Sequence, residues 1–133
     1  MRTEPSTDDN TIFLQAFAAV SDQTAANAIR RSVEERLSRH GAITRCDIPK
    51  QYWKIPEYFE VFIELRPCKP VPETFDNILI ELGCGWEIHR FPGGGNWAVW
   101  NAGPEAAFFI TEVRWANLEC LRRPEPSAAT RIH

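Results

Sequence analysis

A thiol, a carboxylate and an imidazole follow one another closely in the second half of the chain. Cys84 precedes Glu87 and His89, and the last two lie on the same face of a predicted strand. In contact, the three groups could supply a nucleophile, its base and the group that orients the base. Cys84 stands between two glycines outside that strand, however, and no oxyanion-hole motif accompanies it. We therefore predict that the protein is not an enzyme and has no catalytic residues.

Two further sets of potentially reactive side chains are too widely spaced for joint chemistry. Glu60 and Glu64 would lie about 13 Å apart along a strand, too far to act on one substrate bond. The cysteines form no C-x-x-C pair, whereas zinc sites usually combine closely spaced ligand pairs. They are Cys46, Cys68, Cys84 and Cys120. The sequence predicts no metal site and no cofactor, and it predicts thiols that stay reduced.

The elements that position these side chains follow from the hydrophobic periodicity, which switches repeatedly between two and about 3.6 residues. Strands are predicted over 12–20, 42–48, 58–66, 86–91, 96–101 and 108–118, and helices over 21–40 and 72–82. The order is β-α-β-β-α-β followed by two additional C-terminal strands. It predicts an α+β fold with a ferredoxin-like antiparallel sheet and both helices on one face. Whether the last two strands extend the sheet or cover its other face stays open.

The ends of the first predicted helix carry recognisable signals. Ser21 is the predicted N-cap, and Gly41 is the predicted C′ glycine. His40 would interact favourably with the C-terminal end of this helix.

Length and composition describe one globular domain. The chain has 133 residues, of which 44% are hydrophobic and 25% charged. We expect a flexible N-terminus over 1–10, a single α+β domain over 11–121 and a flexible tail over 122–133. The first residues lack the apolar segment of a signal peptide, and no stretch is long enough to span a bilayer. A cytoplasmic location without a membrane partner is therefore expected.

The charge balance bears on the class of partner. The formal net charge is −3, whereas a nucleic-acid-binding protein needs a basic face to neutralise phosphates. The sequence thus favours a basic partner and predicts no binding of nucleic acid.

A candidate partner-binding surface follows from the strand over 58–66. If its alternate apolar residues pack on the helices, the uncovered face presents Tyr58, Glu60, Phe62 and Glu64. Aromatic side chains supply desolvated contact and carboxylates steer a basic protein. Glu87, His89, Trp97 and Trp100 complete the predicted set. Because the two tryptophans are three residues apart, one should lie in the core and the other could be exposed.

Four segments together resemble small bacterial immunity proteins, the inhibitors encoded beside polymorphic toxins and contact-dependent growth inhibition toxins. They span residues 52–67, 85–86, 97–101 and 113–119. The resemblance implies that the chain binds the C-terminal toxic domain of a large secreted effector, often a nuclease, and blocks it inside the producing cell. It assigns no role to single positions, because such proteins share no catalytic residues. A monomer or weak dimer is expected.

Two other functions remain open. An RNA-binding module of the same topology would stack bases on aromatic residues of its strands, here Phe13, Phe17, Tyr58 and Phe62. Glu60 and Glu64 beside them would repel phosphate. A small ferredoxin-like ligand-sensing domain or enzyme would instead need a polar pocket, which Trp53, His89 and Trp115 could line.

Overall fold

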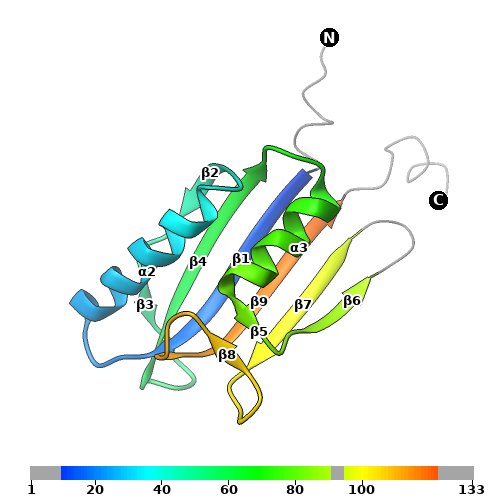
Figure 1. The fold of residues 1–133 in the computed structure, drawn as a ribbon. Helices are drawn as coiled ribbons and strands as arrows, with labels where there is room; N and C mark the ends of the chain where they lie inside the picture. Colours follow the sequence, from blue (N-terminus) through cyan, green and yellow to red (C-terminus); the bar gives the residue numbers. More distant parts are fainter. Residues whose placement is uncertain (1–9, 91–94, 123–133) are drawn as a thin grey trace, which may run out of the picture.

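Two helices and one large sheet make up most of the chain that the structure describes. The computed structural model describes residues 10–90 and 95–122 (Figure 1). The helices are α2 (Gln23–Leu37) and α3 (Val71–Leu82). The strands are β1 (Asn10–Ala19), β2 (Gly41–Cys46), β3 (Lys50–Gln51), β4 (Tyr58–Pro67), β5 (Gly83–Cys84), β6 (Glu87–Arg90), β7 (Asn96–Asn101), β8 (Ala107–Phe108) and β9 (Val113–Arg122). This is an α+β fold, as the periodicities predict.

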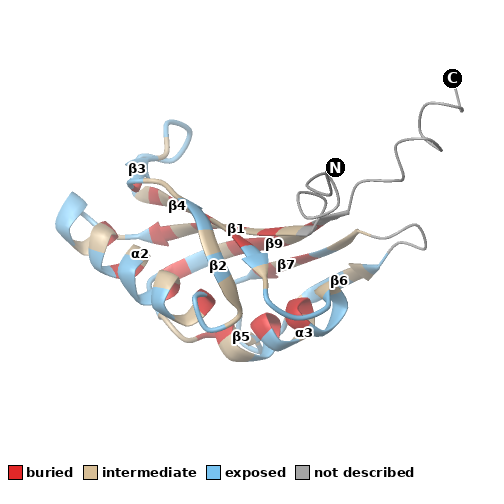
Figure 2. Ribbon diagram, turned by 90° about the horizontal axis from the view of Figure 1, so that it is seen from above, coloured by how far each residue is buried: buried red, intermediate tan, exposed pale blue. Residues whose placement is uncertain are grey.

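The large sheet is antiparallel and carries both helices on one side. Its strand order is β2-β4-β1-β9-β7-β6, with β3 paired to β4, while β5 and β8 form a separate two-stranded sheet. The helices lie on the same face, and the connection between β3 and β4 rises on the opposite side (Figure 2). The expected placement of the helices is therefore correct.

Alternation along the central strands separates a buried face from an uncovered one. In β4, Val61 and Ile63 are buried towards the helices, whereas Phe62 between them is only partly buried. The same alternation holds in β1, whereas in β9 Asn117 is buried together with its neighbours Ala116 and Leu118. The largest fully buried side chains are Ile12, Leu14, Val33, Leu37, Val61, Ile63, Leu65, Phe75, Ile78, Leu82, Val113 and Leu118. The core thus lies between the sheet and the helices, and the apolar residues of 58–66 pack on the helices as expected.

Strand pairing corrects the expected order of the last three strands. The additional strands do not follow a completed ferredoxin-like core: β9 lies beside β1, and β7 and β6 extend the sheet beyond it. Ala116 and Leu118 of β9 are buried, which suits a central strand. β6 is only four residues long and exposes Ile88, which suits an edge. The segment predicted as one strand over 108–118 is divided between β8 and β9.

Both predicted end signals of the first helix are wrong. Asp22, not Ser21, is the N-cap, and its Oδ1 accepts a hydrogen bond of 2.8 Å from the Ala25 amide. Helix α2 ends at Leu37, so Gly41 is no C′ glycine but the first residue of β2. A Cβ there would lie 2.2 Å from the Arg66 carbonyl oxygen. Gly41 is therefore required by the close approach of β4 to β2.

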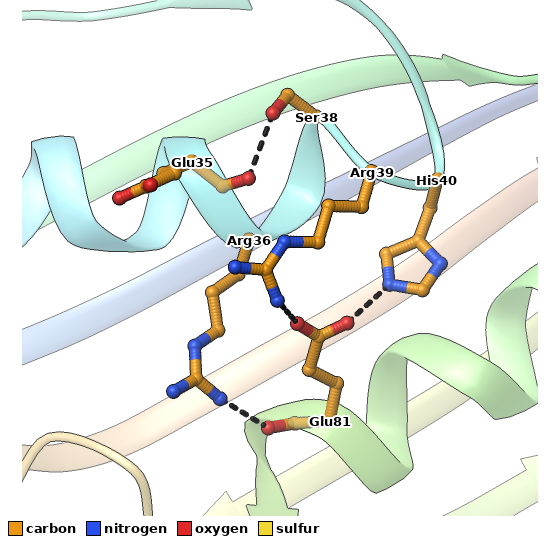
Figure 3. A network of polar contacts seen from close by, with 6 residues as sticks. All are labelled: Glu35, Arg36, Ser38, Arg39, His40 and Glu81. Atoms are coloured by element: carbon orange, nitrogen blue, oxygen red, sulfur yellow. Dashed lines mark hydrogen bonds and ion pairs between the residues drawn. The ribbon is translucent and has the colours of Figure 1, made fainter.

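The C-terminal ends of the two helices are joined through Glu81 of α3 (Figure 3). Its carboxylate accepts from Arg39 Nη1 at 2.6 Å and lies 2.6 Å from His40 Nε2. Arg36 Nη1 donates to the Glu81 backbone carbonyl at 3.1 Å. His40 therefore contacts a carboxylate of the neighbouring helix, rather than only the end of its own, and helps to fix how the helices pack.

The large sheet reaches one residue beyond each end of the range predicted for the domain, 11–121. Asn10 of β1 pairs with Arg122 of β9, so the sheet begins before residue 11 and ends after residue 121. The predicted flexible ends, 1–10 and 122–133, otherwise lie outside the described residues, as does most of the predicted turn over 92–95. No helix within the described ranges is both long and apolar enough to cross a membrane.

Candidate functional site

The candidate site is the side of the large sheet that carries no helix, which we call the open face. Antiparallel pairing places side chains of directly opposed residues on the same face. The register therefore gathers Gln15 with Phe62 and Asn117, Phe17 with Glu60 and Trp115, and Trp97 with His89 and Glu119. Phe13, Tyr58, Glu64, Glu87 and Val99 belong to the same face.

Phe17 is the centre of an aromatic cluster at one end of the open face. Its ring centroid lies 4.5 Å from that of Tyr52, 5.1 Å from that of Trp115 and 6.3 Å from that of Tyr58. Tyr52 belongs to the β3–β4 connection, which also presents Trp53 with 79% of its surface exposed. This connection therefore forms an aromatic rim above the sheet.

A second aromatic pair lies towards the other end of β1. Phe13 and Phe62 have ring centroids 5.4 Å apart, and the Arg45 guanidinium lies 4.8 Å from the Phe62 ring centroid. Arg45 also forms an ion pair of 2.9 Å with Asp47. The hydrogen bonds from Arg45 lower the pKa of the Asp47 carboxyl below its usual value. The charge of Arg45 is thus already paired with the carboxylate of Asp47, the residue that follows β2.

At the β6 edge, the predicted residues Glu87, His89 and Trp97 lie together on the open face. The His89 ring stacks on Trp97 with centroids 4.7 Å apart, and its Nε2 lies 3.2 Å from a Glu87 carboxylate oxygen. Trp97 is 38% exposed. These side chains are available to a partner.

Trp100 was predicted to contribute to the partner-binding surface, but it does not lie on the open face. It is 3% exposed and lies on the helix side of β7. Its Nε1 donates to the Cys84 carbonyl oxygen at 2.8 Å, and its ring packs against Phe108 at a centroid distance of 5.2 Å. Trp100 is therefore a core residue and is removed from the candidate surface, while Trp97 is the exposed member of the pair.

A diagonal row of polar side chains crosses the open face between the two aromatic groups. Gln15 Nε2 donates to Glu60 Oε2 at 2.7 Å, and Asn117 Nδ2 lies 3.4 Å from Glu119 Oε1. Asn117 is only 7% exposed, and its Oδ1 has no hydrogen-bond partner in the described part of the chain. A buried polar atom without a partner typically costs about 1–3 kcal/mol.

Carboxylates outnumber basic side chains on the open face by a small margin. Glu60, Glu64, Glu87 and Glu119 lie on it. Arg45 is opposed to Glu64, Lys50 is opposed to Glu60, and Arg66 follows Glu64 on the same side of β4. An aromatic surface with a small excess of carboxylates has the composition and sign that suit a basic protein.

The residues considered for nucleophilic chemistry are divided between the two sheets. Glu87 and His89 are in contact in the large sheet, but Cys84 belongs to β5 of the small sheet. Its pairing partner there is Ala107. Among the described residues, no group of three or more His, Cys, Asp or Glu side chains is placed to hold a metal ion.

We predict that the thiols differ in reactivity according to their exposure. Cys68 and Cys84 are exposed, Cys46 is partly buried and Cys120 is buried. Burial raises the pKa of the Cys46 thiol more than the hydrogen bond from Arg30 lowers it, so little thiolate forms at neutral pH. Iodoacetamide followed by peptide mass spectrometry should label Cys68 and Cys84 first, Cys46 later and Cys120 last. Early labelling of Cys120 would contradict the pairing of β9.

Several residues of the site escaped prediction. Gln15, Asn117 and Glu119 are polar residues within apolar strands, and Tyr52 reaches the face from a connection. Period-two spacing of Trp115, Asn117 and Glu119 could have placed these three together. The residues proposed for a ligand pocket do not all converge: Trp53 and Trp115 adjoin the Phe17 cluster, whereas His89 stacks on Trp97.

Comparison with known proteins supplies no relative. No family model, no curated protein and no solved structure matches the chain.

Proposed function

We propose that this chain is a binding protein that neutralises a basic bacterial toxin domain, in the manner of the immunity proteins that it resembles. The open face is the proposed contact surface, and no catalytic step is assigned to the chain. The observation that carries the proposal is a broad antiparallel sheet whose helix-free side presents aromatic side chains together with glutamates.

The chemistry of this side supports a protein partner. Partly buried rings such as Phe62 and Trp115 offer apolar area at little cost in side-chain entropy, and exposed Trp53 and Trp97 are typical anchors of protein interfaces. Carboxylates around them speed the encounter with a basic protein. A toxic nuclease is basic where it binds its own substrate, so an acidic inhibitor face matches that surface.

RNA binding is the alternative with a specific observation in its favour, since Phe13, Phe17, Tyr58 and Phe62 do share the open face. Base stacking needs free ring faces, however. Phe17 is already in contact with Tyr52 and Trp115, and Phe13 with Phe62. Glu60 and Glu64 would also repel the phosphates.

The test begins with the reading frame immediately upstream of the gene, where we expect a large secreted protein that ends in a short toxic domain. Co-expression of this chain should restore growth to cells that produce the domain. The two purified proteins should form a complex measurable by calorimetry. A domain that stays toxic and unbound would contradict the proposal. Tight, salt-sensitive binding of single-stranded RNA in a polarisation assay would replace it with the RNA-binding alternative.

A further inference from the structure

We propose that the polar row on the open face is a binding site for the guanidinium group of an arginine side chain that the protein partner presents. This inference rests on the proposed function and names the chemistry of its central contact. The row consists of Glu60, Gln15, Asn117 and Glu119.

The hydrogen bonds within the row leave it rich in acceptors. Gln15 and Asn117 are directly opposed across β1 and β9, so their side chains are neighbours at the middle of the sheet. Each directs its amide nitrogen towards a carboxylate, Gln15 to Glu60 and Asn117 to Glu119. The carbonyl oxygens of both amides, together with the two carboxylates, are groups that only accept hydrogen bonds. The complementary ligand is therefore a donor with positive charge.

The Asn117 oxygen shows that this demand is not met inside the chain. Asn117 is only 7% exposed, and its Oδ1 has no hydrogen-bond partner among the described residues. On the face, Asn117 is directly opposed to Gln15 on one side and to Val99 on the other, and neither gives its oxygen a donor. The site therefore requires the side chains around Asn117 to move aside for the ligand.

The number and spread of the acceptors favour a planar cation. Gln15 and Asn117 lie side by side, and Glu60 and Glu119 lie at the two ends of the row. A guanidinium carries five donors in one plane, whereas an ammonium is compact and strongly hydrated. Arginine thus matches the acceptors better than lysine does.

The inference is tested on the full-length, nitrogen-15-labelled chain by following the side-chain amide resonances of Gln15 and Asn117. The probes are three acetylated and amidated tripeptides, Gly-X-Gly, in which X is arginine, lysine or citrulline. The arginine peptide should shift both amide resonances, the lysine peptide should bind more weakly, and neutral citrulline should leave them in place. Equal shifts with arginine and citrulline, or no shift of these amides with arginine, would overturn the proposal.

The variant Asn117→Leu separates binding from structure. Leucine has a similar size and removes the unpaired oxygen, so the thermal midpoint should stay the same or rise, while the arginine peptide binds about tenfold more weakly. Asn77→Leu, at an exposed position on α3, is the matched control and should leave binding unchanged. A lower midpoint with unchanged binding would make Asn117 a purely structural residue and refute the site.

The toxin domain distinguishes the two proposals. If it binds the wild-type chain and Asn117→Leu equally, the arginine site is refuted while the proposed function stands. If the arginine peptide binds at the amide pair but no toxin domain is captured, the site stands and the proposed function fails.

Discussion

Replacing Glu60 and Glu64 together with lysine is expected to slow association with a basic toxin domain by about ten- to a hundredfold. Both carboxylates lie on the open face of β4, where they alternate with Tyr58 and Phe62. The substitution changes the charge of this surface by four units while leaving the buried alternate residues untouched. Stopped-flow association at low ionic strength measures the rate, and added salt should reduce the difference between variant and wild type.

The matched control reverses the charge at two glutamate positions on the helices. Glu35 of α2 and Glu73 of α3 are exposed on the helices, so Glu35→Lys with Glu73→Lys makes the same change in net charge away from the open face. Its association rate should fall far less. Equal slowing by the two double variants would show that net charge, not the open face, guides the encounter. Urea unfolding of both variants checks that the domain remains folded.

The two faces of β4 were predictable because Val61, Ile63 and Leu65 alternate with residues that include Glu60 and Glu64. A one-residue slip would turn every buried side chain outwards, so the pattern itself selects the register. Val61 and Ile63 could therefore be assigned to the core without knowing any neighbour, whereas β1 carries apolar residues on both faces. The apolar stripe of α3 was predictable for the same reason, since Phe75, Ile78 and Leu82 recur at helical spacing.

The order of the strands was not predictable from such local patterns. The place of β9 beside β1 depends on contacts between segments a hundred residues apart in sequence, such as Phe13 opposite Glu119. Periodicity shows that a strand is half-buried but does not identify its neighbour. The same limit applies to Gly41, whose requirement comes from the Arg66 carbonyl across the strand pair rather than from a helix end.

The candidate site was only partly predictable. Tyr58, Glu60, Phe62 and Glu64 came directly from the alternation of one strand, and they do lie on the open face. Asn117 could be recognised only after β9 was placed beside β1, because its significance lies in being buried opposite Gln15. The sequence did not show which of Trp97 and Trp100 is buried, because this depends on the face of β7 to which each side chain points.

Ile63→Ala is expected to lower the free energy of unfolding by about 2–5 kcal/mol. Ile63 is fully buried on the central strand β4, where it faces Leu14 of β1 in the core between sheet and helices. Truncation removes apolar contacts and leaves a cavity. Because β4 is hydrogen-bonded to β1 on one side and to β2 on the other, it cannot shift to fill this cavity. Because domains are commonly stable by only about 5–15 kcal/mol, this one change removes a large part of the total. Urea denaturation followed by far-ultraviolet circular dichroism measures the loss.

Phe62→Ala is the comparison that makes the Ile63 result informative. Phe62 is the preceding residue but points to the open face, where it contacts Phe13 and Arg45 and is only partly buried. Its removal should cost less stability than Ile63→Ala, although phenylalanine is the larger side chain, and it should weaken toxin binding more. This opposite order of the two effects is expected because residues on the helix side of β4 form the core, whereas residues on its open face are proposed to contact the partner. A greater loss of stability in Phe62→Ala would mean that the open face is packed like a core and is not available to a partner.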